Sequence, residues 1–77
     1  MSRLKLLPYA KLRRVAEACG FEYARRKASH CTFQHPDGRV VVIPDHGSDV
    51  IVRPLLRSII SQMGLSVDEY NEIVEGL

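Results

Sequence analysis

The sequence predicts an α+β fold with the element order α-β-β-β-α(α), in which a three-stranded antiparallel sheet carries its helices on one face. Three observations predict this arrangement. An apolar stripe with helical spacing precedes residue 20, apolar and polar residues alternate around the turn HPDG at residues 35–38, and apolar stripes with helical spacing return after residue 53. The face of the sheet without helices is expected to be open to solvent.

The length and composition indicate a single soluble domain over residues 1–77. Of the 77 residues, 45% are hydrophobic and 26% are charged, a balance typical of a globular protein. No apolar run approaches the roughly 20 residues that a transmembrane helix needs, and the N-terminal stretch lacks the features of a secretory signal. We therefore expect a cytoplasmic protein with no membrane association.

The first helix is expected from about Pro8 to Cys19. Proline favours the first turn of a helix, and glycine, here Gly20, favours the position just past its end. Residues spaced at i, i+3, i+4 and i+7 form its apolar stripe, namely Leu12, Val15, Ala16 and Cys19. Lys11 and Arg14 share a separate flank and project away from the core.

Three strands are expected at about Phe21–Arg26, Ser29–Gln34 and Arg39–Ile43. In the turn that joins the last two, Pro36 presets φ and Gly38 accepts a positive φ. If Gly38 forms the bulge of a three-residue hairpin loop, the numbers of facing residues sum to 74. This register pairs apolar residues on one side of the hairpin and sets His30 opposite Pro44 on the other.

Two helices are expected after the strands. The first runs from about Arg53 to Met63, ends at Gly64, and has a broad apolar face made of Leu55, Leu56, Ile59, Ile60 and Met63. A capping box formed by Ser66 and Glu69 begins the second. Its expected inner face consists of Tyr70, Ile73 and Val74.

The charges are distributed unevenly along the chain. Residues 1–40 hold nine Lys and Arg against three acidic residues, and residues 41–77 hold two against six, so the halves carry +6 and −4 within an overall +2. A basic half presents a positive field to a polyanion such as a nucleic acid. An ordinary solvated face would explain the charges equally well.

His30 has three conceivable roles: a surface residue, a metal ligand or a proton-transfer group. It is adjacent to Cys31 in a strand, so the two side chains point to opposite faces, which disfavours both a shared metal ion and a Cys–His nucleophilic pair. His35 and His46 lie on separate loops without metal-ligand spacing. We therefore expect no metal and no cofactor, and we interpret Cys19 and Cys31 as reduced packing residues.

Cations and a hydroxyl group surround His30 in the sequence. A phosphate held by them would lie within reach of an imidazole, which exchanges protons near neutral pH. RNA is favoured over DNA as the ligand, because its 2′-hydroxyl supplies an internal nucleophile. The predicted catalytic residue is His30, and the predicted RNA-binding residues are Lys11, Arg14, Arg25, Arg26, Lys27, Ser29 and Arg39.

Three stretches resemble the HicA family, the small RNA-cleaving toxins of bacterial toxin–antitoxin pairs, and the resemblance extends over nearly the whole chain. EACGFEYARRKASH resembles the family's helix end and the basic strand that leads into a Gly-Ser-His motif. HPDGRVVVIPDHG resembles its hairpin and proline-x-histidine loop, and LLRSIISQMGLSVDEY is similar to its Leu-Arg-Ser-Ile helix and the capped turn that follows.

The resemblance implies a double-stranded-RNA-binding-like fold, a single HicA-like domain, and ribosome-independent cleavage of mRNA. His30 occupies the position of the family's catalytic histidine, and the implied partner is a HicB antitoxin that covers it. Two positions depart from the family pattern, because Ala28 stands where Gly is usual and Cys31 where a second histidine is common. His46 matches the loop histidine, and no role is assigned to it.

Two other functions stay open on the sequence alone. A non-catalytic module of the same fold could recognise the shape of an RNA duplex, with Lys11 and Arg14 contacting it. An interaction protein could instead use the acidic C-terminal part only to bind an antitoxin. The preferred RNA is not predicted, and neither is the choice between a homodimer and a toxin–antitoxin hetero-oligomer.

Overall fold

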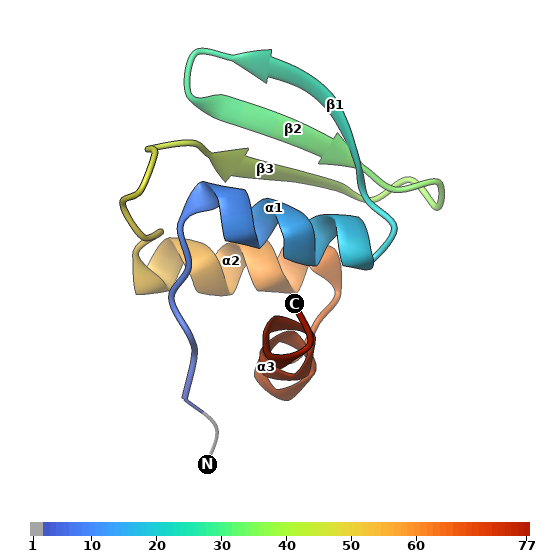
Figure 1. Cartoon of the computed structure of the whole chain (residues 1–77). Helices are drawn as coiled ribbons and strands as arrows, with labels where there is room; N and C mark the ends of the chain where they lie inside the picture. The colour runs from blue at the N-terminus through green and yellow to red at the C-terminus, as the bar shows by residue number, and fades with distance from the viewer. Residues whose placement is uncertain (1–2) are drawn as a thin grey trace.

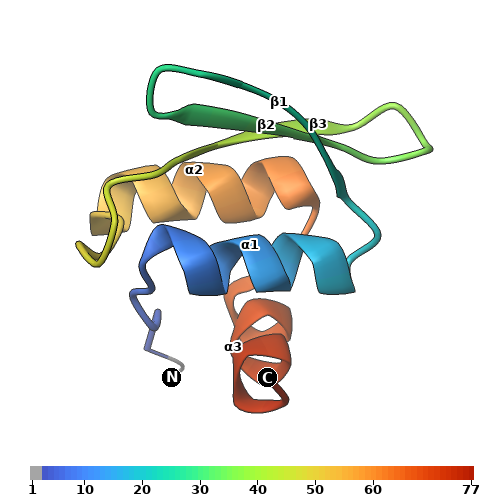
Figure 2. The same cartoon turned by 45° about the horizontal axis from the view of Figure 1, so that its top comes forward.

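The computed structural model describes residues 3–77. Its elements are α1 (Tyr9–Ala18), β1 (Glu22–Lys27), β2 (His30–Gln34), β3 (Val40–Pro44), α2 (Arg53–Met63) and α3 (Val67–Glu75). The strands form one antiparallel sheet in the order β1-β2-β3. α1 and α2 lie side by side against one face of the sheet, α3 lies on the far side of this helix pair, and the other sheet face is uncovered (Figure 1, Figure 2). The predicted α+β architecture is confirmed.

The ends of α1 and of the three strands differ from the prediction by at most one residue, and α2 has the predicted bounds. Pro8 is the N-cap of α1, with an extended backbone, and Cys19 is its C-cap, so both flank the helix. One predicted core position is wrong, because Leu55 is 41% exposed. Leu55 lies roughly 100° around the helix from Leu56, outside the buried stripe that α2 turns towards the sheet.

The core lies between the sheet and the helices that cover it. β2 and β3 send alternate residues into it, and these are almost fully buried: Cys31, Phe33, Val41 and Ile43. Facing them are the buried stripes of α1 (Tyr9, Leu12, Val15 and Ala16) and of α2 (Leu56, Ile59, Ile60 and Met63). Each large apolar side chain contributes roughly 1.5–3 kcal/mol by leaving water. Since this packing uses one sheet face, the other is free to carry polar groups.

The register of β2 against β3 is the predicted one. Residues 30–34 pair with residues 44–40, so the numbers in each pair sum to 74. The hairpin loop is closed by hydrogen bonds from the His35 N–H to the Arg39 carbonyl oxygen (2.9 Å) and from the Gly38 N–H to the His35 carbonyl oxygen (2.9 Å). Gly38 has a φ of 99°, as a three-residue loop with a glycine bulge requires.

A β-bulge in β1 decides which of its residues face the open side of the sheet. Tyr23 pairs with Phe33 on the helix side, and the register then shifts before Arg25. Strict alternation would put Arg25 and Lys27 on the helix side as well. Because Ala24 is the extra residue of the bulge, Arg25 and Lys27 turn instead to the open face.

α3 begins at the predicted capping box, which is confirmed. The Ser66 hydroxyl accepts from the Glu69 N–H (3.1 Å), and the Glu69 carboxylate accepts from the Ser66 N–H (2.9 Å). The buried Tyr70 donates its hydroxyl to the Lys5 carbonyl oxygen (2.6 Å), and the Lys5 ammonium pairs with Glu75 (3.0 Å). These contacts attach α3 to the segment before α1. No helix within residues 3–77 has the length and apolar character needed to cross a membrane.

Candidate active site

Strand pairing places His30 on the uncovered face of the sheet, between Lys27 of β1 and Pro44 of β3. The Asp45 N–H donates to the Ser29 carbonyl oxygen (2.7 Å), so the His30–Pro44 pair is of the closer, non-hydrogen-bonded type. The backbone nitrogen of Pro44, which carries no hydrogen, therefore points away from β2. Proline at this position removes no hydrogen bond between β2 and β3. The His30 side chain is exposed, as a group that meets a ligand must be.

The next row on the same face consists of Arg25, Thr32 and Val42. Side chains directly opposite each other in a sheet lie about 5 Å apart, and diagonal neighbours about 7–8 Å apart. Arg25 and Lys27, both exposed, therefore form one cluster with His30. Thr32 fills the centre of the face and is only 8% exposed. The structure thus brings together three of the predicted site residues.

Arg26 lies on the opposite face of β1 from its two basic neighbours. It pairs with Cys31, which points into the core. Its Nη1 donates to Asp45 Oδ2 (2.8 Å) and its Nε to the Ala28 carbonyl oxygen (2.8 Å). The guanidinium is therefore engaged within the protein, and it connects the β1–β2 turn with the loop that follows β3.

Asp45, which accepts the hydrogen bond from Arg26, was not among the site residues predicted from the sequence. Besides the Arg26 contact, its Oδ1 accepts from the Gly47 N–H (3.0 Å), and its own N–H bonds to Ser29. The Gly47 hydrogen bond first, and then the Arg26 guanidinium, lower the pKa of Asp45 below its ordinary value. An acidic residue directly after Pro44, the strand partner of His30, was the signal available in the sequence.

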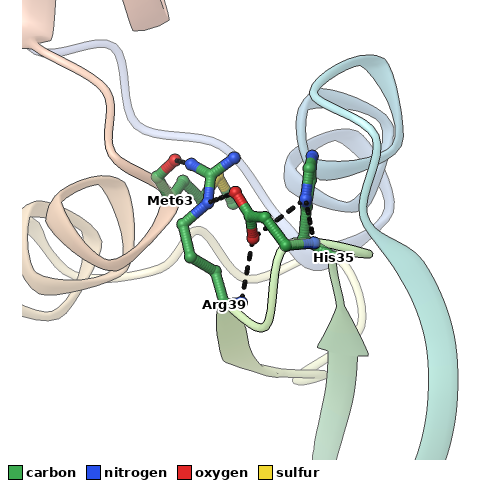
Figure 3. A network of polar contacts seen from close by, with 4 residues as sticks. His35, Arg39 and Met63 are labelled. Carbon is green, nitrogen blue, oxygen red and sulfur yellow. Dashed lines mark hydrogen bonds and ion pairs between the residues drawn. The ribbon is translucent and has the colours of Figure 1, made fainter.

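Arg39 lies at the other end of the hairpin and belongs to a separate network (Figure 3). Its Nε donates to Asp37 Oδ2 (2.8 Å), its Nη1 donates to the Met63 carbonyl oxygen at the end of α2, and its guanidinium carbon lies 5.2 Å from the centre of the Phe21 ring. The Arg39 N–H first, and then its guanidinium, lower the pKa of Asp37. Arg39 thus connects the hairpin turn to α2, and it does not join the His30 cluster.

The remaining predicted RNA-binding residues lie apart from the cluster or beside it. Lys11 and Arg14 are exposed on α1, which packs on the helix side of the sheet. Ser29 is half-buried in the β1–β2 turn directly before His30, and its carbonyl oxygen is occupied by Asp45. The predicted site residues therefore do not form one surface. Some lie on the open face of the sheet, Lys11 and Arg14 lie on α1, and Arg26 and Arg39 are held in contacts within the protein.

The other polar features lie away from His30. A shallow hollow of about 240 Å³ at the opposite end of the sheet is lined by Glu22, Tyr23, Ala24, Gln34, His35 and Pro36. His35 Nδ1 accepts from the Asp37 N–H (3.1 Å), and its ring packs edge-on against Phe21. Cys19 and Cys31 are free thiols. Residues 3–77 contain no group of three or more His, Cys, Asp or Glu side chains that could hold a metal ion.

The cluster on the open face has a definite chemical capacity. Arg25 and Lys27 supply hydrogen-bond donors and positive charge to an anionic ligand. His30 supplies an imidazole, a side chain that can accept or donate a proton. The protein is therefore a small α+β domain that presents an exposed histidine and two exposed cations on an uncovered sheet face.

The sequence of this domain matches a known family. Residues 9–65, from α1 to just beyond α2, match the profile of the family described as "HicA toxin of bacterial toxin-antitoxin". A protein of Pseudomonas fluorescens (strain Pf0-1), named "Probable mRNA interferase HicA", is 36% identical over 59 residues, which cover 77% of this chain and 97% of the relative. The chain belongs to the HicA toxin family.

Proposed function

We propose that the protein is the toxin of a toxin–antitoxin pair and that it cleaves mRNA without the ribosome, using His30 for proton transfer. The observation that carries the proposal is the position of His30, exposed on the open face with Lys27 opposite it and Arg25 diagonal to it. Family membership and the mRNA interferase name of the Pseudomonas relative support the same reading.

The residues of the cluster divide the work of the reaction. Arg25 and Lys27 hold the phosphodiester against the sheet and offset its charge as the 2′-oxygen approaches phosphorus. His30 removes the proton of the 2′-hydroxyl, so that no protein nucleophile and no metal ion is required. Positioned proton transfer of this kind contributes roughly 10²–10⁴-fold to the rate. Arg26 and Arg39 act within the fold and do not contact the substrate.

A HicB-type antitoxin is the proposed partner. Because His30 lies on an uncovered face, a protein that docks on this face blocks the imidazole and the two cations together. Neutralisation then needs no conformational change in the toxin. A protein with this substrate and this partner would act in the cytoplasm, and its complex with the antitoxin would be a hetero-oligomer.

The proposal is tested by comparing the wild type with His30→Ala. In cells we expect the wild type to stop growth and deplete bulk mRNA, and the variant to do neither. Purified wild type should cleave labelled RNA in the absence of ribosomes, and His30→Ala should cleave at least 100-fold more slowly. Gln34→Ala, an exposed position on the same strand and face, is the control. Equal toxicity and cleavage by wild type and His30→Ala would refute the proposal.

A second candidate function is a binding module that recognises RNA without cutting it. The observation that favours it is the exposure of Lys11 and Arg14 on α1, a second basic surface apart from His30. Such a module would retard labelled RNA in a gel and leave it intact. The same purified protein and the same RNA therefore distinguish the two functions.

A further inference from the structure

His46 lies on the loop directly beyond the strand partner of His30. Pro44 is the Cα partner of His30, and the next residue, Asp45, donates its N–H to the Ser29 carbonyl oxygen. β3 ends at Pro44, and Asp45 and His46 begin the loop that follows it. His46 therefore lies two residues beyond the strand partner of His30, and its side chain is exposed.

The loop that carries His46 is anchored on both sides of this residue. Before it, Asp45 accepts the Arg26 guanidinium (2.8 Å) and donates its N–H to Ser29 (2.7 Å). After it, the Gly47 N–H donates to the Asp45 carboxylate (3.0 Å). Arg26 also holds the Ala28 carbonyl oxygen (2.8 Å). The turn that precedes His30 and the loop that carries His46 are thus joined by one ion pair, which limits their relative movement.

The spacing suits two groups that act on one phosphodiester. A cross-strand spacing of about 4.5 Å and a reach of at most about 7 Å for two residues keep the Cα atoms of His30 and His46 within about 12 Å of each other. Two imidazoles at this separation can each reach one of the two oxygens on opposite sides of a phosphorus atom.

We propose, on the basis of the function proposed above, that His46 is the general acid of the reaction and that Arg26 and Asp45 are its positioning residues. His30 takes the proton of the 2′-hydroxyl while the 2′-oxygen bonds to phosphorus. The bond from phosphorus to the 5′-oxygen breaks, and His46 gives its proton to that oxygen. The products are a 2′,3′-cyclic phosphate and a 5′-hydroxyl. The reaction needs neither an oxidant nor a cofactor.

The test uses two versions of a short RNA with one mapped cleavage site. One has the normal linkage and the other has sulfur in place of the 5′-oxygen, because a thiolate leaves without a proton from an acid. His46→Ala should cleave the normal RNA roughly 10²–10⁴-fold more slowly than wild type and should cleave the sulfur RNA within tenfold of the wild-type rate. His30→Ala should be slow on both. Ser48→Ala, in the same loop, is the control and should match wild type.

Asp45→Asn tests the positioning residues with the same substrates. Asparagine can still accept the Gly47 N–H, but it loses the charged contact with Arg26. We expect at least tenfold slower cleavage of the normal RNA, recovery on the sulfur RNA, and an unchanged KM. A general loss of structure would slow cleavage of both substrates, so the recovery identifies an effect exerted through the acid.

The outcomes separate this proposal from the one on which it rests. Wild-type cleavage by His46→Ala on the normal RNA overturns the role of His46, and so does a variant that is slow on both RNAs. In either case a slow His30→Ala leaves the endoribonuclease assignment intact. If wild type and His30→Ala behave alike, both proposals fall.

Discussion

Ala28 adopts a backbone conformation that favours glycine. Among residues 3–77 it is the only residue other than glycine with a positive φ, 54°. It is the first of the two residues that join Lys27 to its strand partner His30, the position at which a type II′ turn usually has glycine. A left-handed conformation costs an L-residue about 1–2 kcal/mol. The turn that positions His30 is therefore strained in this chain, at the position where the resemblance to the HicA family led us to expect glycine.

Ala28→Gly should stabilise the protein. The strain is removed, and part of the gain is offset by the greater freedom of glycine in the unfolded chain, so we expect the free energy of unfolding to rise by about 0.5–1 kcal/mol. Urea denaturation measures it. Ser29→Gly is the matched control, because Ser29 has no positive φ and only the entropic loss applies. The explanation fails if both glycine variants change stability in the same direction.

At the scale of residues, the sequence correctly predicted the sheet face on which His30 lies, but not the faces of its basic neighbours in β1. The alternation of Cys31 and Phe33 put His30 on the open face, because only one register buries both. In β1 all six residues are exposed, so no burial pattern revealed the bulge at Ala24 or the separation of Arg26 from Arg25 and Lys27. The contact between Arg26 and Asp45 depends on the conformation of the loop after β3, which no periodicity encodes.

At the scale of elements, Arg39 connects the β2–β3 hairpin to the end of α2. Its guanidinium contacts Asp37, the Met63 carbonyl oxygen and the Phe21 ring, which belong to three separate segments. The approach is close, because a Cβ atom at Gly64 would lie 2.8 Å from Arg39 Nη1. Gly64 also has a φ of 80°, so glycine both ends α2 and leaves room for the guanidinium.

Arg39→Ala should destabilise the fold and leave the chemistry unchanged. Losing hydrogen bonds to a charged group and the contact with Phe21 should lower the free energy of unfolding by about 1.5–3 kcal/mol, measured by urea denaturation. Arg39→Lys should recover little, because an ammonium cannot form the planar fork. Arg57→Ala, on the exposed side of α2, is the control and should change stability by less than about 0.5 kcal/mol. An RNA-binding role for Arg39 would appear instead as a raised KM in a protein of normal stability.

The attachment of α3 predicts a dependence of stability on alkaline pH. Burial raises the pKa of Tyr70 to about 12, while an unfolded tyrosine ionises near pH 10. Because the folded-state pKa is the higher one, this contribution to stability is complete below about pH 10 and is lost as the pH rises towards 12. Tyr70→Phe should be about 1 kcal/mol less stable than wild type at pH 7, since it lacks the hydrogen bond to Lys5.

The difference between wild type and Tyr70→Phe should then shrink above pH 10 and reverse, because phenylalanine cannot ionise. Urea denaturation of both proteins at pH 7, 9, 10 and 11 measures the change. The two proteins share all other titrating groups, so the contributions of those groups to the pH dependence of stability cancel in the comparison. A difference that stays constant from pH 7 to 11 would contradict burial of the hydroxyl as the cause.

At the scale of the whole molecule, the fold places the cations of the open sheet face and the acidic residues of α3 on opposite sides. The acidic residues of α3 lie beyond the α1–α2 pair, away from the open face of the sheet that carries Arg25 and Lys27 (Figure 1, Figure 2). This arrangement was visible in the sequence as an asymmetry between halves, but its direction in space required the fold. A polyanion is attracted to the open face and repelled by α3, which favours encounters that bring RNA to His30.

Two double variants can show whether contact or overall charge governs RNA binding. Arg25→Ala with Lys27→Ala and Lys11→Ala with Arg14→Ala each remove two positive charges, from the open face and from α1 respectively. On a short single-stranded RNA the first pair should raise KM and reduce the slope of log affinity against log salt by about 1.4. The Lys11→Ala with Arg14→Ala variant should keep its KM within about twofold of wild type and leave the salt slope nearly unchanged. A short strand bound at His30 does not extend around to α1. If the two variants weaken binding equally, the net field governs association, and the open face is not the place where the phosphates are held.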